Sequence, residues 1–581
     1  MDGFRAEVNM RKYSKGVTIV EGIAIGKASI LFRDSIDTKN IAYIIGNEYE
    51  KEIALFEATR QTVLEKINEL QSNMKKKNPE EAKIFDAHAE IVKDPELEKK
   101  VRLLIKQKNY TCRSALLVSF KEISNMLEQI DDELIKERAK DIEDIGKMFI
   151  DTIDGDKNKN ANMFYEEGTI LIAEELFPSD LASVSKDYIK GIALSKGSAT
   201  SHVAIMAKGL KIPTVFGITG ITDMIKQGDE IIIDGYNGTI YENPDSATLD
   251  KYNDLKKNYE TKQKKERDIL KRIPFTTDKT RIDLAVNIGS SNSYKPEIAQ
   301  FTDGVGLMRT EFLFMERNDF PSEEEQFDVY RSVLQDFAGK PVVLRTLDIG
   351  GDKKLNYLPL PEEENPFLGC RAIRLCFENP EIMHTQLRAA FRASAYGNLQ
   401  IMYPMVGSLD DWNRIQGFVE KVKKELQEKN IPFGLIKQGI MIEIPSIVML
   451  AEEISKEVDF ASIGTNDLAQ YLTATDRMSD LVRPYYQSFT PGLFRFIKIA
   501  IDAFHKNKKP LSVCGELGGD PRGAAILIGM GIRKLSVSPS LLANIKELVT
   551  TKSLVELEEI AENVLNFGKQ DEVLDYINKK L

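Results

Sequence analysis

The segment "KGSATSHVAIMAKG", Lys196–Gly209, contains one of only four histidines in the 581 residues of the chain. Ser201 or Thr200 has the side chain needed to cap a helix that begins at about Val203. At a helix N-terminus an imidazole tends to stay neutral and nucleophilic, and the N–H groups there stabilise a phosphate attached to it. The pattern is therefore consistent with two interpretations of His202, a phosphate-accepting nucleophile and a capped structural histidine.

A second group of reactive side chains lies in the C-terminal half, directly after apolar segments. Arginines bind carboxylate and phosphate bidentately, and Mg²⁺ takes one or two protein carboxylates together with substrate oxygens. Each charge taken singly could also be half of a buried ion pair. Together the side chains predict a site for a small phosphorylated carboxylic acid and Mg²⁺. They are Asn287, Arg309 with Glu311, Arg345 with Asp348, Met405, Glu443, Asn466 with Asp467, and Cys514 with Glu516.

Other residues of the same chemical types have weaker contexts. Arg477 follows the sixth apolar segment and is either a further substrate contact or a solvated loop charge. Cys514 ends an apolar run, so it is either a small buried hydrophobe or a thiol that exchanges a proton with a substrate carbon. Structural or surface roles are expected for the remaining histidines and cysteines, which are His88, His384, His505, Cys112, Cys370 and Cys376.

Eight apolar segments that alternate with helical patterns position the C-terminal groups. They are "RIDLAVNIG", "GVGLMRTEF", "PVVLRTLDIG", "LQIMYPMV", "QGIMIEIPS", "DFASIGTND", "PLSVCGE" and "KLSVSPS". Eight βα units over roughly 260 residues are the size of a (β/α)8 TIM barrel, whose functional residues collect at the C-terminal ends of the strands. This architecture would bring the groups listed above to one rim.

The pattern of the N-terminal half predicts strands, with a helical segment inserted between them. Gly16–Leu31 and Gly168–Asn243 consist of short β-branched runs, and Asn237-Gly238 is a hairpin signal. Between them, Glu48–Asp151 shows helical periodicity, with Asn78-Pro79 and Asp94-Pro95 as predicted helix starts. Asp245–Ile273 is highly charged and predicts a long solvated linker helix. The expected fold is thus α/β and multidomain, with a β/α domain (1–47 and 152–245), an inserted helical subdomain (48–151), a linker (246–275) and a barrel (276–581).

Composition limits the partners. Lys and Arg number 79 against 90 Asp and Glu, so the net charge of −11 argues against nucleic acid and favours a basic protein partner. The four cysteines have no metal-type spacing and fit a reducing compartment. We found no apolar run of about 18 residues and no signal peptide at the start, so no membrane insertion is expected and the cytoplasm is the predicted location.

Several motifs of the chain resemble enzyme I of the bacterial phosphoenolpyruvate:sugar phosphotransferase system. The resemblance covers nearly the whole chain, including "IFDAHAEIVKDPEL" and "KERAKDIEDIGK" in the helical segment. The motifs that carry it are "TSHVAIMA" (Thr200–Ala207), "GVGLMRTEFLF" (Gly304–Phe314), "RTLDIGGDK" (Arg345–Lys353), "ENPFLGCRAIR" (Glu364–Arg374), "IGTNDLAQY" (Ile463–Tyr471) and "CGELGGD" (Cys514–Asp520).

The resemblance implies a function and a role for each matching residue. A swivelling β/α domain carries the phosphorylated histidine, here His202, which takes phosphate from phosphoenolpyruvate. It passes the phosphate to a histidine of the small carrier protein HPr, which docks on the helical subdomain. Cys514 matches the proton donor to the enolate carbon, and the barrel would form a homodimer. The implied phosphoenolpyruvate contacts are Arg309, Arg345, Asn466, Asp467 and Arg477, and the implied Mg²⁺ ligands are Glu443 and Asp467.

The departures from the family pattern gather around His202. Ser198 and Ala199 stand where a glycine and a basic residue are usual, Val203 replaces a common threonine, and Leu181 replaces a polar residue expected near the histidine. Elsewhere Met478-Ser479 and Cys370 also differ. The resemblance leaves two alternatives, a regulatory phosphotransferase that docks a protein without sugar uptake, and a relative of pyruvate phosphate dikinase or phosphoenolpyruvate synthase.

Overall fold

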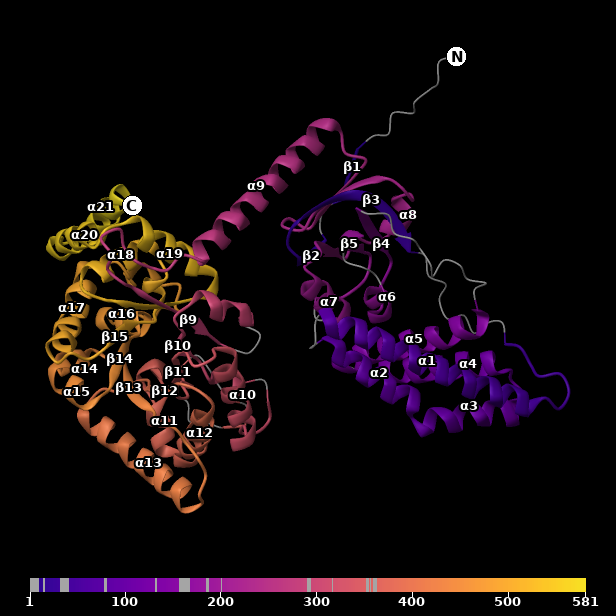
Figure 1. Ribbon diagram of the computed structural model, residues 1–581, viewed down its shortest axis with the longest axis horizontal. Helices are drawn as coiled ribbons and strands as arrows, with labels where there is room; N and C mark the ends of the chain where they lie inside the picture. The colour runs from indigo at the N-terminus through magenta and orange to yellow at the C-terminus, as the bar shows by residue number, and fades with distance from the viewer. Residues whose placement is uncertain are drawn as a thin grey trace, which may run out of the picture. The chain divides into compact units, whose positions relative to one another are not determined.

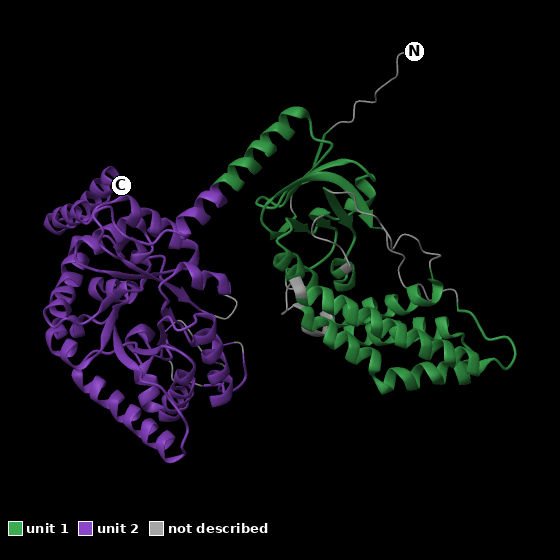
Figure 2. Cartoon of the chain, in the orientation of Figure 1, with its two compact units in different colours: residues 1–261 green, residues 262–581 purple. Residues whose placement is uncertain are grey.

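The computed structural model describes residues 10–13, 16–31, 41–77, 81–130, 133–155, 168–183, 188–199, 201–289, 294–315, 317–351, 355, 357–358 and 363–581. The chain forms two compact units, residues 1–261 and 262–581 (Figure 2). The helix start predicted at Asn78-Pro79 and the residue Thr200 lie outside the described residues.

The first unit contains an eight-stranded mixed sheet (Figure 1). Its strand order is β1-β8-β7-β3-β4-β5-β6-β2, and β3 to β6 run parallel. The predicted hairpin is confirmed, because β7 and β8 pair antiparallel across a turn in which Gly238 has a φ of 60°. The strands are β1 (Arg11–Tyr13), β2 (Val17–Val20), β3 (Ile23–Leu31), β4 (Thr169–Ala173), β5 (Ile189–Leu194), β6 (Thr214–Phe216), β7 (Glu230–Asp234) and β8 (Thr239–Glu242).

Both faces of this sheet are covered. Alternate residues of β4 belong to different apolar clusters: Leu171 and Ala173 pack with helices of the unit, and Ile170 and Ile172 pack on the opposite face. A strand buried on two faces is apolar at every position, as the segment "TILIA" is. The helices of this part are α6 (Pro178–Ser183), α7 (His202–Leu210) and α8 (Ile221–Met224).

A bundle of long helices forms the rest of the first unit (Figure 1). Apolar residues spaced three and four apart bury one face of each helix, as the sequence predicts. The predicted start at Asp94-Pro95 is confirmed, because the Asp94 carboxylate accepts a hydrogen bond from the Glu96 N–H at 2.8 Å. The helices are α1 (Tyr49–Lys77), α2 (Ile84–Lys93), α3 (Pro95–Lys108), α4 (Cys112–Glu128) and α5 (Glu133–Asp154).

The charged segment after the sheet is one helix, α9 (Ser246–Leu270). Its first half belongs to the first unit and its second half to the other. Tyr252 anchors the first half, since its hydroxyl donates to the Asp234 carboxylate at 2.9 Å. The second half holds the ion pair between Lys265 and Glu547, at 2.9 Å.

The second unit is built around a closed barrel of eight parallel strands. All eight predicted strands are present, so the expected α/β multidomain architecture with a (β/α)8 barrel is confirmed. The strands are β9 (Asp283–Ile288), β10 (Val305–Met308), β11 (Val342–Arg345), β12 (Leu399–Tyr403), β13 (Lys437–Ile442), β14 (Phe460–Ile463), β15 (Leu511–Val513) and β16 (Lys534–Val537).

Helices surround the barrel and share one large apolar core with its strands (Figure 1). Across the described ranges, no helix is both long enough and apolar enough to cross a membrane. The helices of this unit are α10 (Glu323–Asp336), α11 (Ile373–Glu378), α12 (Pro380–Ala393), α13 (Leu409–Glu428), α14 (Pro445–Met449), α15 (Ala451–Glu457), α16 (Thr465–Thr473), α17 (Pro491–Lys506), α18 (Pro521–Gly529), α19 (Leu542–Thr551), α20 (Leu554–Asn566) and α21 (Gln570–Lys580).

Candidate active site

His202 is the first residue of α7, one position earlier than the sequence suggested. Ser201 is the N-cap: its hydroxyl oxygen accepts a hydrogen bond from the Ala204 N–H at 3.2 Å and its O–H donates to the Ser198 carbonyl at 2.9 Å. The cap fixes the start of the helix and the direction in which the histidine leaves it. The His202 side chain is 42% exposed.

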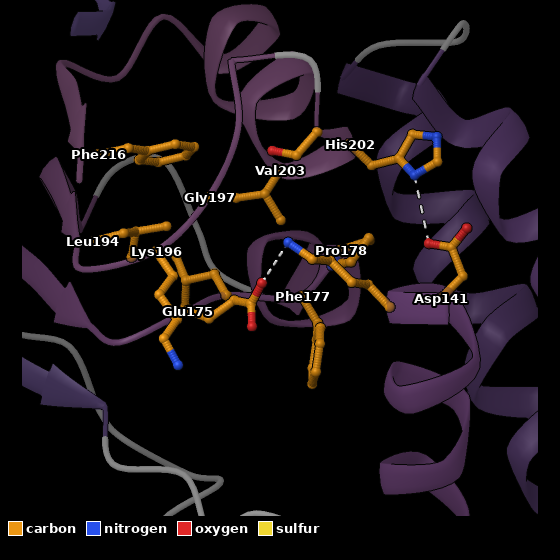
Figure 3. Close-up of a pocket in the computed structure, with 13 residues that line it drawn as sticks. Asp141, Glu175, Phe177, Pro178, Leu194, Lys196, Gly197, His202, Val203 and Phe216 are labelled. Atoms are coloured by element: carbon orange, nitrogen blue, oxygen red, sulfur yellow. Dashed lines mark ion pairs between the residues drawn. The ribbon is translucent and has the colours of Figure 1, made fainter. Parts of the chain in front are cut away.

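Asp141 of α5 faces His202, and sequence reasoning missed it. The Nδ1 atom of His202 lies 3.4 Å from Oδ1 of Asp141, and the other ring nitrogen points away from that carboxylate (Figure 3). Burial alone would raise the pKa of the Asp141 carboxyl, but the contacts with His202 and His88 outweigh it and leave the pKa below its usual value. One signal was present in the sequence, since Asp141 and Asp144 lie three residues apart on a face of α5 that is otherwise apolar.

A pocket opens beside His202, lined by charged and apolar side chains (Figure 3). Two lysines at its edge pair with glutamates: Lys140 with Glu175 at 2.7 Å and Lys196 with Glu174 at 2.8 Å. The pocket is therefore bounded by ion pairs as well as by Leu176, Phe177, Leu194 and Phe216.

The residues that depart from the family pattern give this site an apolar base. Leu181 of α6 and Val203 of α7 are buried in the same apolar cluster. The backbone carbonyl of Ala199 accepts a hydrogen bond from Lys208 Nζ at 3.2 Å. Val203 therefore adds apolar surface to the pocket beside His202, where the family commonly has a threonine hydroxyl.

In the second unit, the residues predicted at strand ends do gather at one rim of the barrel. Arg345, at the end of β11, pairs with Glu311 and, at 2.9 Å, with Asp348. Burial opposes the charge of Arg345, yet Glu311 and Asp348 overcome it and hold the guanidinium pKa above its usual value. This is a buried ion-pair network, the alternative that the sequence left open, located where a barrel binds substrates.

Arg371 extends the network and was not among the predicted site residues. It donates to Asp348 at 2.8 Å, lies 3.5 Å from Asp467 and contacts the Tyr471 hydroxyl at 3.2 Å. Its side chain is buried, and the next residue, Ala372, has a φ of 53°. A non-glycine residue in that region is strained and is most common at functional sites. The position of Arg371 inside the "RAIR" motif was the available sequence signal.

Glu443, after β13, is fully buried beside these charges. Its Oε1 accepts from the Met405 N–H at 2.6 Å, while Oε2 has no hydrogen-bond partner among the described residues. Burial, followed by repulsion from Asp467 and Asp348, raises the pKa of Glu443 to about 8. A carboxylate crowded by other carboxylates has the electrostatic character of a cation ligand.

The predicted loop and strand-end residues complete the rim. Asn466 accepts a hydrogen bond from the Glu516 N–H at 3.1 Å, and Arg477 lies 3.6 Å from Asp467. Arg309 is exposed after β10. Asn287, the first predicted strand-end residue, donates to the Cys514 carbonyl at 3.0 Å.

Cys514 lies inside the rim, with its sulfur 3.7 Å from the Ile463 carbonyl. Burial raises the pKa of its thiol, so the proton is retained at neutral pH. The following Gly515 is needed for close packing, because a Cβ there would come within 2.6 Å of the Thr465 backbone nitrogen. The protonated thiol of Cys514, directly after β15, therefore lies at the same rim of the barrel as Arg309 and Arg345.

The metal prediction can be tested against the donor set. Among described residues there is no group of three or more His, Cys, Asp and Glu side chains with the geometry of a metal site. Mg²⁺ needs fewer, because it commonly takes one or two protein carboxylates together with substrate phosphate and water. The unpaired Oε2 of Glu443 and its repulsion from Asp467 fit a divalent cation that binds together with an anionic substrate.

The chain was compared with known proteins. Three family models match: "PEP-utilising enzyme, PEP-binding domain" over residues 262–554, "PEP-utilising enzyme, N-terminal" over 15–138, and "PEP-utilising enzyme, mobile domain" over 165–238. PEP is phosphoenolpyruvate. The class is therefore that of the PEP-utilising enzymes.

Full-length relatives define the family more narrowly. The phosphoenolpyruvate-protein phosphotransferase of Staphylococcus aureus is 38% identical over 571 residues, which are 98% of this chain and 99% of the relative. The protein of the same name from Listeria monocytogenes is 38% identical over 98% of this chain and 99% of its own. An NMR structure of an Enzyme I protein is 35% identical and covers 43% of this chain and 100% of its own, with a TM-score of 0.37. This chain belongs to the phosphoenolpyruvate-protein phosphotransferase family of transferases.

Proposed function

We propose that the protein transfers the phosphoryl group of phosphoenolpyruvate to its own His202 and then to a histidine of the carrier protein HPr, the first step of sugar uptake by the phosphotransferase system. The observation that carries the proposal is the placement of His202 at the start of a capped helix with Nδ1 directed at Asp141. A ring that donates its Nδ1 proton to a carboxylate keeps a lone pair on Nε2. Nε2 is then the attacking atom.

The bonds made and broken are simple. A bond forms between Nε2 of His202 and phosphorus, and the bond between phosphorus and the enol oxygen of phosphoenolpyruvate breaks. The enolate of pyruvate takes a proton on its methylene carbon, and Cys514 supplies it. The buried thiol suits this role because its pKa is raised and the proton is present at neutral pH.

The barrel rim supplies the substrate site. Arg309, Arg345 and Arg477 bind the carboxylate and phosphate groups, and Asn466 donates a further hydrogen bond. Glu443 and Asp467 are the residues that would hold Mg²⁺, and a bound Mg²⁺ would supply positive charge to the phosphoryl group. The arginines orient the substrate while the metal ligands remain fixed by the buried network.

The remaining assignments follow the same proposal. Residues 1–47 and 152–245 form the swivelling phosphohistidine domain, 48–151 dock HPr, 246–275 link the halves, and 276–581 bind phosphoenolpyruvate and form a homodimer. The four unpaired cysteines support a cytoplasmic location. No nucleic acid or membrane partner is proposed.

Mapping of the phosphorylated residue tests the function directly. The protein is incubated with phosphoenolpyruvate and Mg²⁺, with and without HPr, and both proteins are analysed by mass spectrometry. Phosphate on His202 that passes to HPr is the expected result. Phosphate that stays on this chain would favour a regulatory phosphotransferase, and pyruvate turnover that requires ATP would favour a relative of pyruvate phosphate dikinase.

A further inference from the structure

We propose that His88 is a positioning residue for His202 and acts through the carboxylate of Asp141. The inference rests on the proposed function, in which Nε2 of His202 accepts the phosphoryl group. It assigns a role to a histidine for which the sequence indicated only a structural or surface position.

The two histidines converge on one oxygen atom. Nε2 of His88 lies 3.5 Å from Oδ1 of Asp141, and Nδ1 of His202 lies 3.4 Å from that same oxygen. Within the described ranges, Asp141 is the one carboxylate within 4 Å of a His88 ring nitrogen. Neither ring nitrogen of His88 has a hydrogen-bond partner among the described residues, so the Asp141 carboxylate is the acceptor that an N–H on Nε2 of His88 would face.

His88 is rigidly held, in contrast to the histidine it acts on. Its side chain is fully buried in α2, and the Phe85 ring packs edge-on against it with ring centroids 5.6 Å apart. The His202 side chain is 42% exposed at the edge of the pocket. His88 therefore provides the fixed side of the arrangement, and His202 the side that reacts.

The charge of Asp141 is what links the two rings. An ionised carboxylate only accepts hydrogen bonds, so it can accept one from each imidazole N–H, whereas a protonated carboxyl group would itself act as a donor to one of the rings. Burial favours the protonated form of Asp141, and the contacts from His202 and His88 outweigh burial and lower its pKa. His88 thus helps to keep Asp141 ionised and oriented, and Asp141 selects the His202 tautomer with its lone pair on Nε2.

The test compares donor-free and donor-retaining variants in the full-length protein labelled with ¹⁵N in its histidine rings. His88→Phe removes the N–H donor and keeps a ring, while His88→Gln keeps an amide N–H near the position of Nε2. In the wild type, the ¹⁵N shifts of His202 should report a protonated Nδ1. His88→Phe should produce a mixture of tautomers and slow the labelling of His202 by phosphoenolpyruvate about tenfold, the effect of one hydrogen bond to a charged group. His88→Gln should stay close to the wild type.

A double-mutant cycle separates positioning from packing. In an Asp141→Asn background, His88→Phe should cause no further loss of rate, because its effect passes through that carboxylate. An equal loss with and without Asp141, or an unchanged His202 tautomer in His88→Phe, would overturn the proposal. His384→Phe is the matched control, since His384 pairs with Glu425 at 2.9 Å in the other unit and should leave His202 unaffected.

Two controls separate a positioning role of His88 from a folding defect and from failure of the proposed function. Thermal unfolding identifies a folding defect in His88→Phe, and His88→Met is then the donor-free variant, because its flexible side chain fills irregular space. The tautomer measurement needs no phosphoenolpyruvate. If the wild type takes no phosphate from phosphoenolpyruvate, the proposed function fails, while the ring shifts still decide whether His88 positions His202.

Discussion

The two reactive regions of the molecule are held in opposite ways. In the second unit, Arg345 and Arg371 are buried and cross-linked to Glu311, Asp348 and Asp467 by several ion pairs. In the first unit, His202 is half-exposed and faces the carboxylate of Asp141 across a long contact of 3.4 Å. The barrel region is a network of buried ion pairs, whereas the region in the first unit presents a half-exposed imidazole at the start of a helix.

The difference follows from what each region must do. A site that orients a small anion gains from charges fixed before the substrate arrives, because no reorganisation is needed during the reaction. A histidine that takes a phosphoryl group from one partner and gives it to another must be accessible to both. Closely packed polar side chains around the ring would block this access. We therefore expect loss of a buried charge from the barrel network to damage folding and binding together, and loss of the His202 ring to damage reactivity alone.

The largest effect is expected for His202→Ala. Loss of the nucleophile should lower phosphorylation by phosphoenolpyruvate more than about 1000-fold, as loss of a covalent catalyst does. Binding of phosphoenolpyruvate with Mg²⁺ should remain, since that site lies in the other unit. Mass spectrometry and calorimetric titration measure the two quantities, and loss of both would contradict the division of labour between the regions.

Arg371→Met and Asp141→Asn compare the two regions directly. Removing Arg371 takes from Asp348 one of two buried guanidinium partners, the other being Arg345, and should lower the free energy of unfolding by about 3 kcal/mol, with loss of phosphoenolpyruvate binding. Asp141→Asn breaks a longer, more exposed contact and should cost about 1 kcal/mol. Denaturant unfolding gives both values, and equal losses would show that the regions are held with similar strength.

Cys514→Ala should affect chemistry more than binding. Loss of a general acid should slow pyruvate formation about 100-fold while phosphoenolpyruvate binding stays near that of the wild type. Because burial raises the pKa of the Cys514 thiol, the donor form persists as the pH rises, and wild-type pyruvate formation should hold past the pH at which a free cysteine loses its proton. Single-turnover assays across this pH range test both points, and a wild-type rate in the variant would exclude the donor role.

The sequence predicted which side chains meet at the barrel rim because strand ends have a fixed geometry. Once "RTLDIGGDK" and "IGTNDLAQY" are placed on parallel strands, Arg345 and Asp467 must reach the same rim. Arg371 was missed as a site residue because it belongs to no strand: it follows a 3-10 turn, and only the folded loop brings it to Asp348.

The surroundings of His202 were less predictable for a related reason. Asp141 is 61 positions away in the chain on an amphipathic helix, and the helical pattern does not specify which carboxylate of that helix faces His202. His88 lies still farther away, and its helical pattern indicated nothing beyond a core or surface position. Contacts between packed helices depend on which faces meet, and periodicity within one helix does not specify that.

The smallest effect is expected for Leu181→Thr, which restores a polar residue where the family pattern has one. Leu181 is buried in the apolar cluster that contains Val203, so the substitution should lower the free energy of unfolding by about 2 kcal/mol. The rate of His202 phosphorylation should change less than about threefold, because Asp141 already holds Nδ1 and a second acceptor adds little to a proton that has a partner. Leu210→Thr, in the same cluster but at the far end of α7, is the control for lost packing. A tenfold gain in rate for Leu181→Thr alone would mean that a shortage of polar side chains near His202 limits its phosphorylation. The difference between the two regions would then be a deficiency of this chain and not a requirement of the reaction.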